Sequence, residues 1–235
     1  MALPSMGITE YLTTGALAVL LGLDRTAFLQ SMVSRPLVAA PLTGWLLGIP
    51  LAGLEVGMLL ELLWLGQLPV GTVIPPDDTQ VAIGATLLAL TLERLLGLHG
   101  MPAVILCVLV AIPLGQFGRY ADGRARQANN RLARQADAAA VAGDSRQIEW
   151  LHLCGTGHFA LSGLVTCAAI VAAGTLLLYP LAPLLIGTVR ETGLSLQYSF
   201  TLIGAAVLLG TLNVSRGLLL FSGAFVATLL VLWLR

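Results

Sequence analysis

Charged side chains are scarce in this sequence. Only 10% of the 235 residues are Asp, Glu, Lys or Arg, whereas 57% are hydrophobic. A typical soluble domain carries about 25% charged residues, so the composition excludes an ordinary soluble globular protein and predicts a chain embedded in lipid. At roughly 20 residues for each membrane-spanning helix, the length accommodates about six to nine spans.

Lysine is absent, so all twelve basic residues are arginines. Half of them fall in one polar segment near the middle of the chain, namely Arg119, Arg124, Arg126, Arg131, Arg134 and Arg146. Because the flanking sequence is apolar, we interpret this cluster as a topology signal and not as a nucleic-acid-binding patch. Arginine beside spans marks the cytoplasmic side. We therefore expect residues 119–149 to be cytoplasmic in a multi-pass protein of the bacterial inner membrane.

Motifs for catalysis are lacking as well. The three cysteines lie in or beside apolar runs without metal-ligand spacing, and we interpret them as buried, reduced thiols. The sequence contains no Gly-rich phosphate loop, no HExxH pattern and no Ser-His-Asp order. It therefore predicts neither an enzyme nor a metal or cofactor site.

Apolar runs divide the chain into an N-terminal membrane half (1–118), a polar connector (119–149) and a C-terminal membrane half (150–235). Runs of eighteen or more apolar residues predict spanning helices, and the first run of this chain, 11–23, is a little short. We expect them over 11–23, 36–54, 79–92, 95–118, 192–215 and 217–234. The charge-free stretch 150–189 is long enough for two passes, and Pro180 and Pro183 predict the turn between them.

The connector is rich in Ala, Arg and Gln, which favour helix. Gly143 is expected to end that helix. Two interpretations stay open: a solvated linker helix on the membrane surface, or a docking surface for a soluble partner.

A carboxylate interrupts the apolar run between residues 56 and 65. On a helix, Gly53, Gly57 and Glu61 share one face because they stand four residues apart. The glycines allow another backbone to approach closely, and a carboxylate at membrane depth usually faces a cavity or a partner. Glu61 is therefore the leading candidate for a solute-binding residue. The alternative is a structural ion pair, for which Arg35 is the obvious partner, and Arg35 joins the candidate set.

The stretch that follows Trp64 predicts a broken or re-entrant segment near residues 66–78. Pro69, Pro75 and Pro76 remove backbone donors there. Irregular backbone at membrane depth is tolerated only inside protein or along a wet cavity, and such segments commonly form solute sites in transporters.

Two acidic residues follow this break. Asp77 and Asp78 open the next helix, and we expect Asp78 to cap it. That would leave Asp77 free to bind solute with Glu61 and Gln67. Asp78 also belongs to the set of candidate binding residues. Carboxylates suit a sugar because each accepts hydrogen bonds from two hydroxyl groups. Trp45 and Trp64 could stack on a sugar ring, and anchoring at the membrane interface is the default interpretation for both.

At these same residues the sequence resembles a known family. Leu23–Gly48 (LDRTAFLQSMVSRPLVAAPLTGWLLG), Gly57–Asp77 (GMLLELLWLGQLPVGTVIPPD), Ala136–Leu153 and Leu218–Leu230 are similar to the membrane subunit IIC of the mannose/fructose/sorbose class of bacterial phosphotransferase systems. These runs are distributed along most of the chain, from residue 23 to residue 230, in the family's order. The passage between Gly193 and Leu212 departs from the family's pattern.

The resemblance implies a sugar translocator without a phosphorylated residue of its own. It also implies a hetero-oligomer with a second membrane subunit, IID, and phosphorylation of the sugar by cytoplasmic IIA and IIB proteins. Its sugar-contacting residues fall on Glu61 and on the Pro76-Asp77 step.

The sequence therefore predicts an all-α, polytopic integral membrane protein that takes up a hexose-like sugar which partner subunits phosphorylate. Two alternatives stay open: the substrate-capturing subunit of another small-solute importer, and a regulatory relative that transports nothing.

Overall fold

The computed structural model describes residues 7–65, 74–191 and 196–211, together with single positions between 217 and 230. Within these ranges the chain forms helices and no strand. The helices are α1 (Ile8–Thr26), α2 (Pro36–Leu46), α3 (Pro50–Trp64), α4 (Asp78–Leu96), α5 (Met101–Leu114), α6 (Gln116–Ala142), α7 (Ser145–Glu191) and α8 (Leu196–Thr211). Three helices, Asp78–Leu96, Met101–Ala142 and Ser145–Val189, are long and apolar enough to cross a membrane. The all-α membrane class is confirmed.

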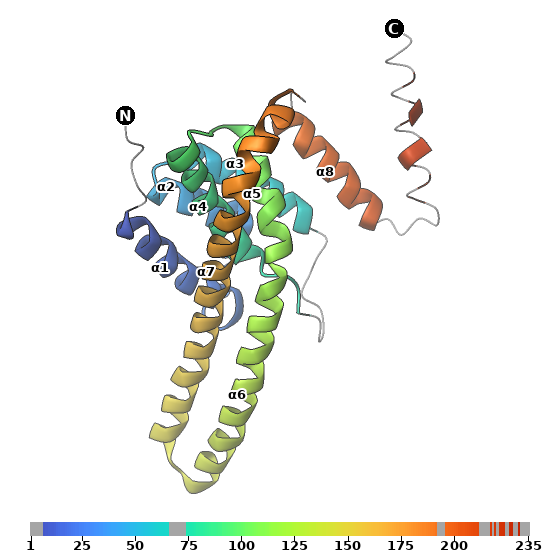
Figure 1. The fold of residues 1–235 in the computed structure, drawn as a ribbon. Helices are drawn as coiled ribbons and strands as arrows, with labels where there is room; N and C mark the ends of the chain where they lie inside the picture. Colours follow the sequence, from blue (N-terminus) through green and yellow to red (C-terminus); the bar gives the residue numbers. More distant parts are fainter. Residues whose placement is uncertain are drawn as a thin grey trace.

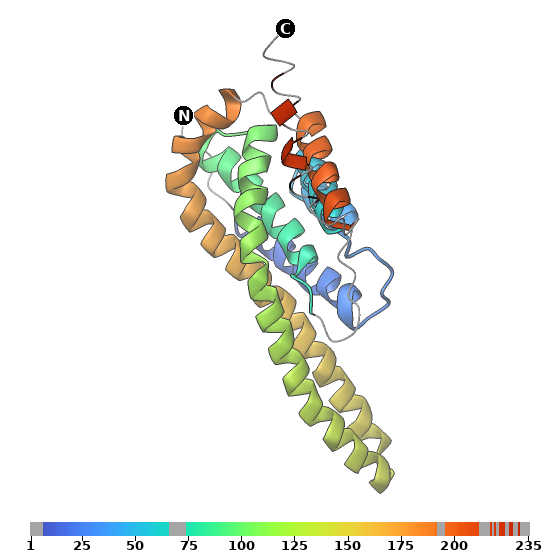
Figure 2. The ribbon, with the colours of Figure 1, turned by 90° about the vertical axis from the view of Figure 1, so that its right-hand side faces the viewer.

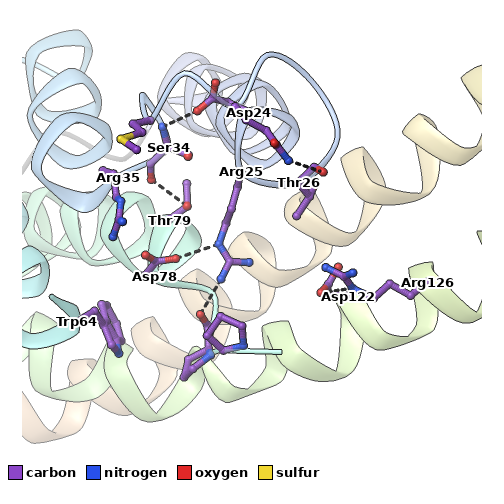
Figure 3. Close-up of a pocket in the computed structure, with 14 residues that line it drawn as sticks. Asp24, Arg25, Thr26, Ser34, Arg35, Trp64, Asp78, Thr79, Asp122 and Arg126 are labelled. Carbon is purple, nitrogen blue, oxygen red and sulfur yellow. Dashed lines mark hydrogen bonds and ion pairs between the residues drawn. The ribbon is translucent and has the colours of Figure 1, made fainter. Parts of the chain in front are cut away.

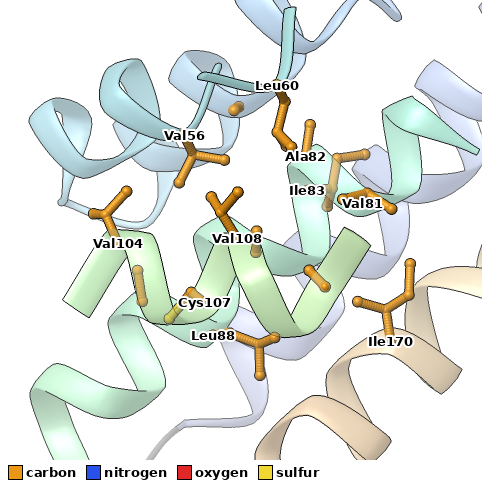
Figure 4. Close-up of a cluster of buried hydrophobic side chains, with 14 of the residues drawn as sticks. Val56, Leu60, Val81, Ala82, Ile83, Leu88, Val104, Cys107, Val108 and Ile170 are labelled. Carbon is orange, nitrogen blue, oxygen red and sulfur yellow. The ribbon is translucent and has the colours of Figure 1, made fainter. Parts of the chain in front are cut away.

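Helix α4 is the centre of the fold. Every residue from Thr79 to Leu92 is buried, as expected for a helix that is apolar on all sides. Helices α1, α2, α3, α5 and α7 all contact it. Figure 4 shows the resulting cluster, in which Val56 and Leu60 of α3, Val108 of α5 and Ile170 of α7 surround the side chains of α4.

Helices α2 and α3 form a short hairpin, which corrects the expected single span over 36–54. Gly48 adopts a left-handed conformation with φ of 80°, and Pro50 starts the next helix. At 1.5 Å per residue, the 11-residue α2 and 15-residue α3 are about 16 and 22 Å long. Both are shorter than a hydrocarbon core of about 30 Å. The hairpin is therefore re-entrant in character, and hydropathy missed its turn because Gly48 and Ile49 are apolar.

The predicted close approach along Gly53 and Gly57 is confirmed within this hairpin. A Cβ atom on Gly53 would lie 2.5 Å from the carbonyl oxygen of Ala40, and one on Gly57 would lie 2.7 Å from that of Pro36. Both contacts are too close for a real side chain. The two glycines therefore set the spacing between α2 and α3.

Helices α6 and α7 form a long antiparallel hairpin that projects from the bundle (Figure 1, Figure 2). We call this projection the arm, residues 116–160. Gly143 ends α6 with φ of 75°, as predicted. The 47-residue α7 would be about 70 Å long, which is more than twice the thickness of a hydrocarbon core.

The predicted turn at Pro180 and Pro183 is wrong, because α7 continues through both residues. A proline removes a single backbone hydrogen bond, and neighbouring helices can support the helix at that point. The stretch 150–189 is therefore one helix and not two passes.

Candidate functional site

A polar cavity of about 370 Å³ lies where the arm leaves the bundle. Its volume is at the lower end of the roughly 300–1,000 Å³ of small-molecule sites. The lining comes from the end of α1, the loop 27–35, the end of α3, the residues before α4, the first turn of α4 and the first half of α6 (Figure 3). The residues are Asp24, Arg25, Thr26, Gln30, Met32, Ser34, Arg35, Trp64, Pro75, Pro76, Asp78, Thr79, Asp122 and Arg126.

The loop 27–35 is held in an unusual conformation by Asp24. Leu29, Gln30 and Met32 all have φ between 52° and 65°, which is uncommon for residues other than glycine. The buried Asp24 carboxylate accepts hydrogen bonds from the Ser31 backbone N–H (2.8 Å), the Ser31 hydroxyl (2.6 Å) and a further loop N–H at 3.0 Å. One side chain thus compensates the backbone strain of this cavity wall.

The irregular segment expected before α4 is present at residues 74–77. Residues 66–73, and Gln67 with them, lie outside the described residues. Asp77 is the N-cap of α4, and its Oδ1 accepts the Gln80 N–H at 3.1 Å. The expectation that Asp78 caps this helix is wrong: the side chain one position earlier reaches the free N–H, and Asp78 faces the cavity instead.

Arg25 joins α1 to the segment before α4. Its Nε donates to Asp78 Oδ1 at 2.9 Å, and one terminal nitrogen donates to the Pro76 carbonyl oxygen at 2.9 Å. The same guanidinium lies 3.8 Å from Asp77 Oδ1. The carbonyl of the buried Pro76 thus has a charged donor. The end of α1 is thereby fastened to the start of α4.

Glu61 lies beside the N-terminus of α2 and not among the residues that line the cavity. Its Oε2 accepts the Leu37 N–H at 3.3 Å, and its Oε1 lies 3.7 Å from a terminal nitrogen of Arg35. An acidic group at a helix N-terminus is stabilised by the helix dipole. The ion pair with Arg35 expected as the alternative is therefore formed. Arg35 itself lines the cavity. A direct contact between Glu61 and a solute stays a prediction.

Sequence reasoning missed Arg25, Asp24 and Asp122. The first two follow directly after the apolar run 11–23 and were given no role. Asp122 was counted with the arginine-rich segment, although Gly118, Asp122 and Ala125 follow helical spacing and are all buried on α6. That spacing was the signal available for an inward-facing carboxylate.

The chain is similar to proteins of one family. A sequence model of the family described as "PTS system sorbose-specific iic component" matches residues 8–232. The chain belongs to this family.

Individual relatives share part of the chain. The mannose-specific EIIC component of Escherichia coli (strain K12) is 29% identical over 119 residues, which are 51% of this chain and 42% of that protein. The fructose permease IIC component of Bacillus subtilis (strain 168) is 31% identical over 124 residues, 53% of this chain and 43% of that protein. The sorbose-specific EIIC component of Lacticaseibacillus casei is 30% identical over 118 residues, 50% of this chain and 40% of that protein. The chain thus matches less than half the length of these IIC components.

Solved structures match more of the fold. A structure described as the cryoEM structure of mannose transporter ManYZ in complex with microcin E492 has a TM-score of 0.63 at 20% identity, covering 96% of this chain and 88% of that one. A second, described as the structure of a membrane protein, has a TM-score of 0.67 at 19% identity, covering 95% of this chain and 87% of that one. At these identities the likeness concerns the fold alone.

Proposed function

We propose that this chain is the sugar-translocating IIC subunit of a phosphotransferase system, and that the cavity beside Arg25 and Asp78 is its sugar site. The observation that carries the proposal is the lining of the cavity, which combines three carboxylates with three guanidinium groups and one Trp side chain. Carboxylates accept hydrogen bonds from the hydroxyl groups of a sugar, and guanidinium groups donate hydrogen bonds to the oxygens of those hydroxyl groups. Trp64 offers an apolar face to a sugar ring.

Among the candidate residues, Asp78 and Arg35 are proposed to contact the sugar, because both line the cavity. Asp77 contributes by capping α4 and thereby fixing the position of Asp78. Glu61 acts through Arg35, to which it is paired. For Gln67, sugar binding is proposed from the sequence alone.

The cavity lies at the base of the arm, which supports a proposal for its orientation. The exposed charges of α6 and of the following turn are mostly arginines, and arginine marks the cytoplasmic side of a membrane. Residues 119–149 are therefore proposed to be cytoplasmic in the bacterial inner membrane. The cavity then opens towards the cytoplasm, where a phosphoryl donor reaches the sugar.

The partners are proposed from the family. The chain would pair with a IID membrane subunit in a higher-order hetero-oligomer. Cytoplasmic IIA and IIB proteins would carry the phosphoryl group and perform the transfer, so the chain itself would not be an enzyme. Phosphate adds charge, and a charged sugar does not recross hydrocarbon.

The test is sugar uptake in a bacterial strain that lacks its own permeases for these sugars. The strain expresses the chain with the subunits encoded beside it and receives labelled mannose, fructose and sorbose. The expected result is accumulation of a phosphorylated sugar and co-purification with a IID chain. Co-purification with an ATPase module would instead identify another class of importer. Unchanged uptake across the panel would favour a regulatory relative.

A further inference from the structure

Asp122 is the one charged residue of α6 that is buried; its relative exposure is 4%, whereas every other charged residue of that helix is exposed. Its position follows from packing. A Cβ atom on Gly118 would lie 2.4 Å from the Cβ of Asp77, so α6 presses directly against the step before α4. Asp122 lies one turn further along the same face. The fold therefore places this carboxylate in the cavity wall.

One oxygen of Asp122 is paired and the other is not. Oδ2 accepts a hydrogen bond from Arg126 Nε at 2.9 Å. Oδ1 is buried and has no hydrogen-bond partner among the residues that the structure describes. A buried charged oxygen without a donor is costly. Because Asp122 lines the cavity, a molecule bound there can supply the missing donor.

The surrounding charges indicate what kind of donor fits. Arg25 interacts electrostatically with Asp122 as well as with Asp78, and it lies between them in the view of Figure 3. The three carboxylates of the lining are balanced by three guanidinium groups. A cationic ligand would leave an excess of positive charge in a part-buried space, and an anionic one an excess of negative charge. A neutral hydroxyl donates its hydrogen without disturbing the balance.

We propose that Asp122 Oδ1 accepts the hydrogen of one hydroxyl group of a neutral sugar and so determines which sugars the cavity binds. This inference rests on the proposed function. It assigns a specificity residue on the arm, facing the sugar from the side opposite Asp78. A site that accepts a hydroxyl hydrogen rejects analogues that lack it, because its own polar group is then left unpaired.

The test uses deoxyfluoro sugars, in which fluorine replaces one hydroxyl and accepts weakly but cannot donate. The purified full-length chain is titrated with mannose, fructose and sorbose, and then with each monodeoxyfluoro analogue of the sugar that binds. At least one analogue, the one that lacks the hydroxyl bound by Asp122, is expected to bind about 10- to 100-fold more weakly than its parent sugar, as for loss of a hydrogen bond to a charged group.

Asp122→Asn identifies the residue responsible. Arg126 requires an acceptor, so the asparagine would turn its oxygen towards Arg126 and its NH₂ towards the cavity. That NH₂ can donate to fluorine, so the penalty for one of the weakly bound analogues is expected to shrink to less than about threefold, while any penalty that arises at Asp78 stays. Asp137→Asn, an exposed acid on the same helix, should retain the full penalty.

Two results would overturn the inference and leave the proposed function standing. One is wild-type protein that binds every analogue as well as the parent sugar. The other is Asp122→Asn protein that keeps the full penalty. Wild-type protein that binds none of the three sugars would overturn the inference and the proposed function together. The wild-type titration requires no variant to fold.

Discussion

Arg25 and Asp78 join the last turn of α1 to the first turn of α4, with Nε and Oδ1 2.9 Å apart. The opposite ends of the same two helices are joined by Glu10 and Arg94, at 2.5 Å. Each charge sits at the helix end where the dipole favours its sign. The two pairs thus hold α1 and α4 antiparallel in equivalent ways, but only the first lines the cavity. The pair of Glu10 and Arg94 is therefore a control for the pair of Arg25 and Asp78, because it has the same structural role without lining the cavity.

The loop 27–35 is expected to depend on Asp24. Asp24→Ala removes all three hydrogen bonds to the loop, whereas Asp24→Asn keeps one acceptor oxygen of the same shape. The stability of the purified protein should fall in the order wild type, Asp24→Asn, Asp24→Ala, with the alanine variant losing on the order of 3 kcal/mol. Thermal unfolding in detergent measures the order. Equal midpoints for all three would remove Asp24 from this role.

The α2–α3 hairpin is expected to reject side chains at its glycines. In Gly57→Ala the new Cβ would lie 2.7 Å from the Pro36 carbonyl oxygen and 3.0 Å from Pro41 Cδ. Overpacking of this kind costs about 1–3 kcal/mol, so the unfolding midpoint should fall. Gly157→Ala on α7 is the matched control, since nothing lies within 4 Å of its Cβ position. An undisturbed midpoint in Gly57→Ala would contradict the close packing.

Glu61→Gln is expected to weaken sugar binding, but by less than a change in the cavity wall itself. The substitution keeps the shape and removes the charge that pairs with Arg35. Because the effect passes through Arg35, it should lie at the lower end of the 1–3 kcal/mol given for a lost polar interaction. Equilibrium binding measures it. Wild-type affinity, at normal protein levels, would remove Glu61 from the site.

Residues 119–149 are expected to face the cytoplasm. A single cysteine introduced at Asp137, which is exposed, in a variant lacking the three native cysteines should resist an impermeant maleimide in intact cells. It should react after the membrane is permeabilised. Labelling in intact cells would reverse the proposed orientation.

Sequence patterns predicted the helices whose ends carry a local signal. Gly143 ends α6 because only a residue without a side chain adopts its left-handed conformation easily. Helix α4 begins at the predicted Asp pair. The interior of a membrane helix gives no such signal, so Pro180 and Pro183 were mistaken for a turn. The turn at Gly48 was missed although Gly48 and Pro50 are typical of helix boundaries, because the run 36–54 is apolar throughout and long enough for one span.

The site was harder to predict than the fold because it is assembled from distant segments. The Asp78 carboxylate is held in place by a hydrogen bond from Arg25, which is 53 residues away in the sequence. The sequence placed Pro75–Asp78 in the candidate site because prolines and acids inside an apolar chain are conspicuous, and three of these four residues line the cavity. Its partners were not, because arginines and aspartates at helix ends are common and only tertiary packing shows which of them meet.

Sugar binding to Asp78→Asn and Glu10→Gln protein, side by side with wild type, tests the central claim most directly. Equilibrium titration of the purified chain should show an affinity about 10- to 100-fold lower for Asp78→Asn and an unchanged affinity for Glu10→Gln. Equal affinities for the two variants would contradict the placement of the sugar in the cavity beside Arg25 and Asp78.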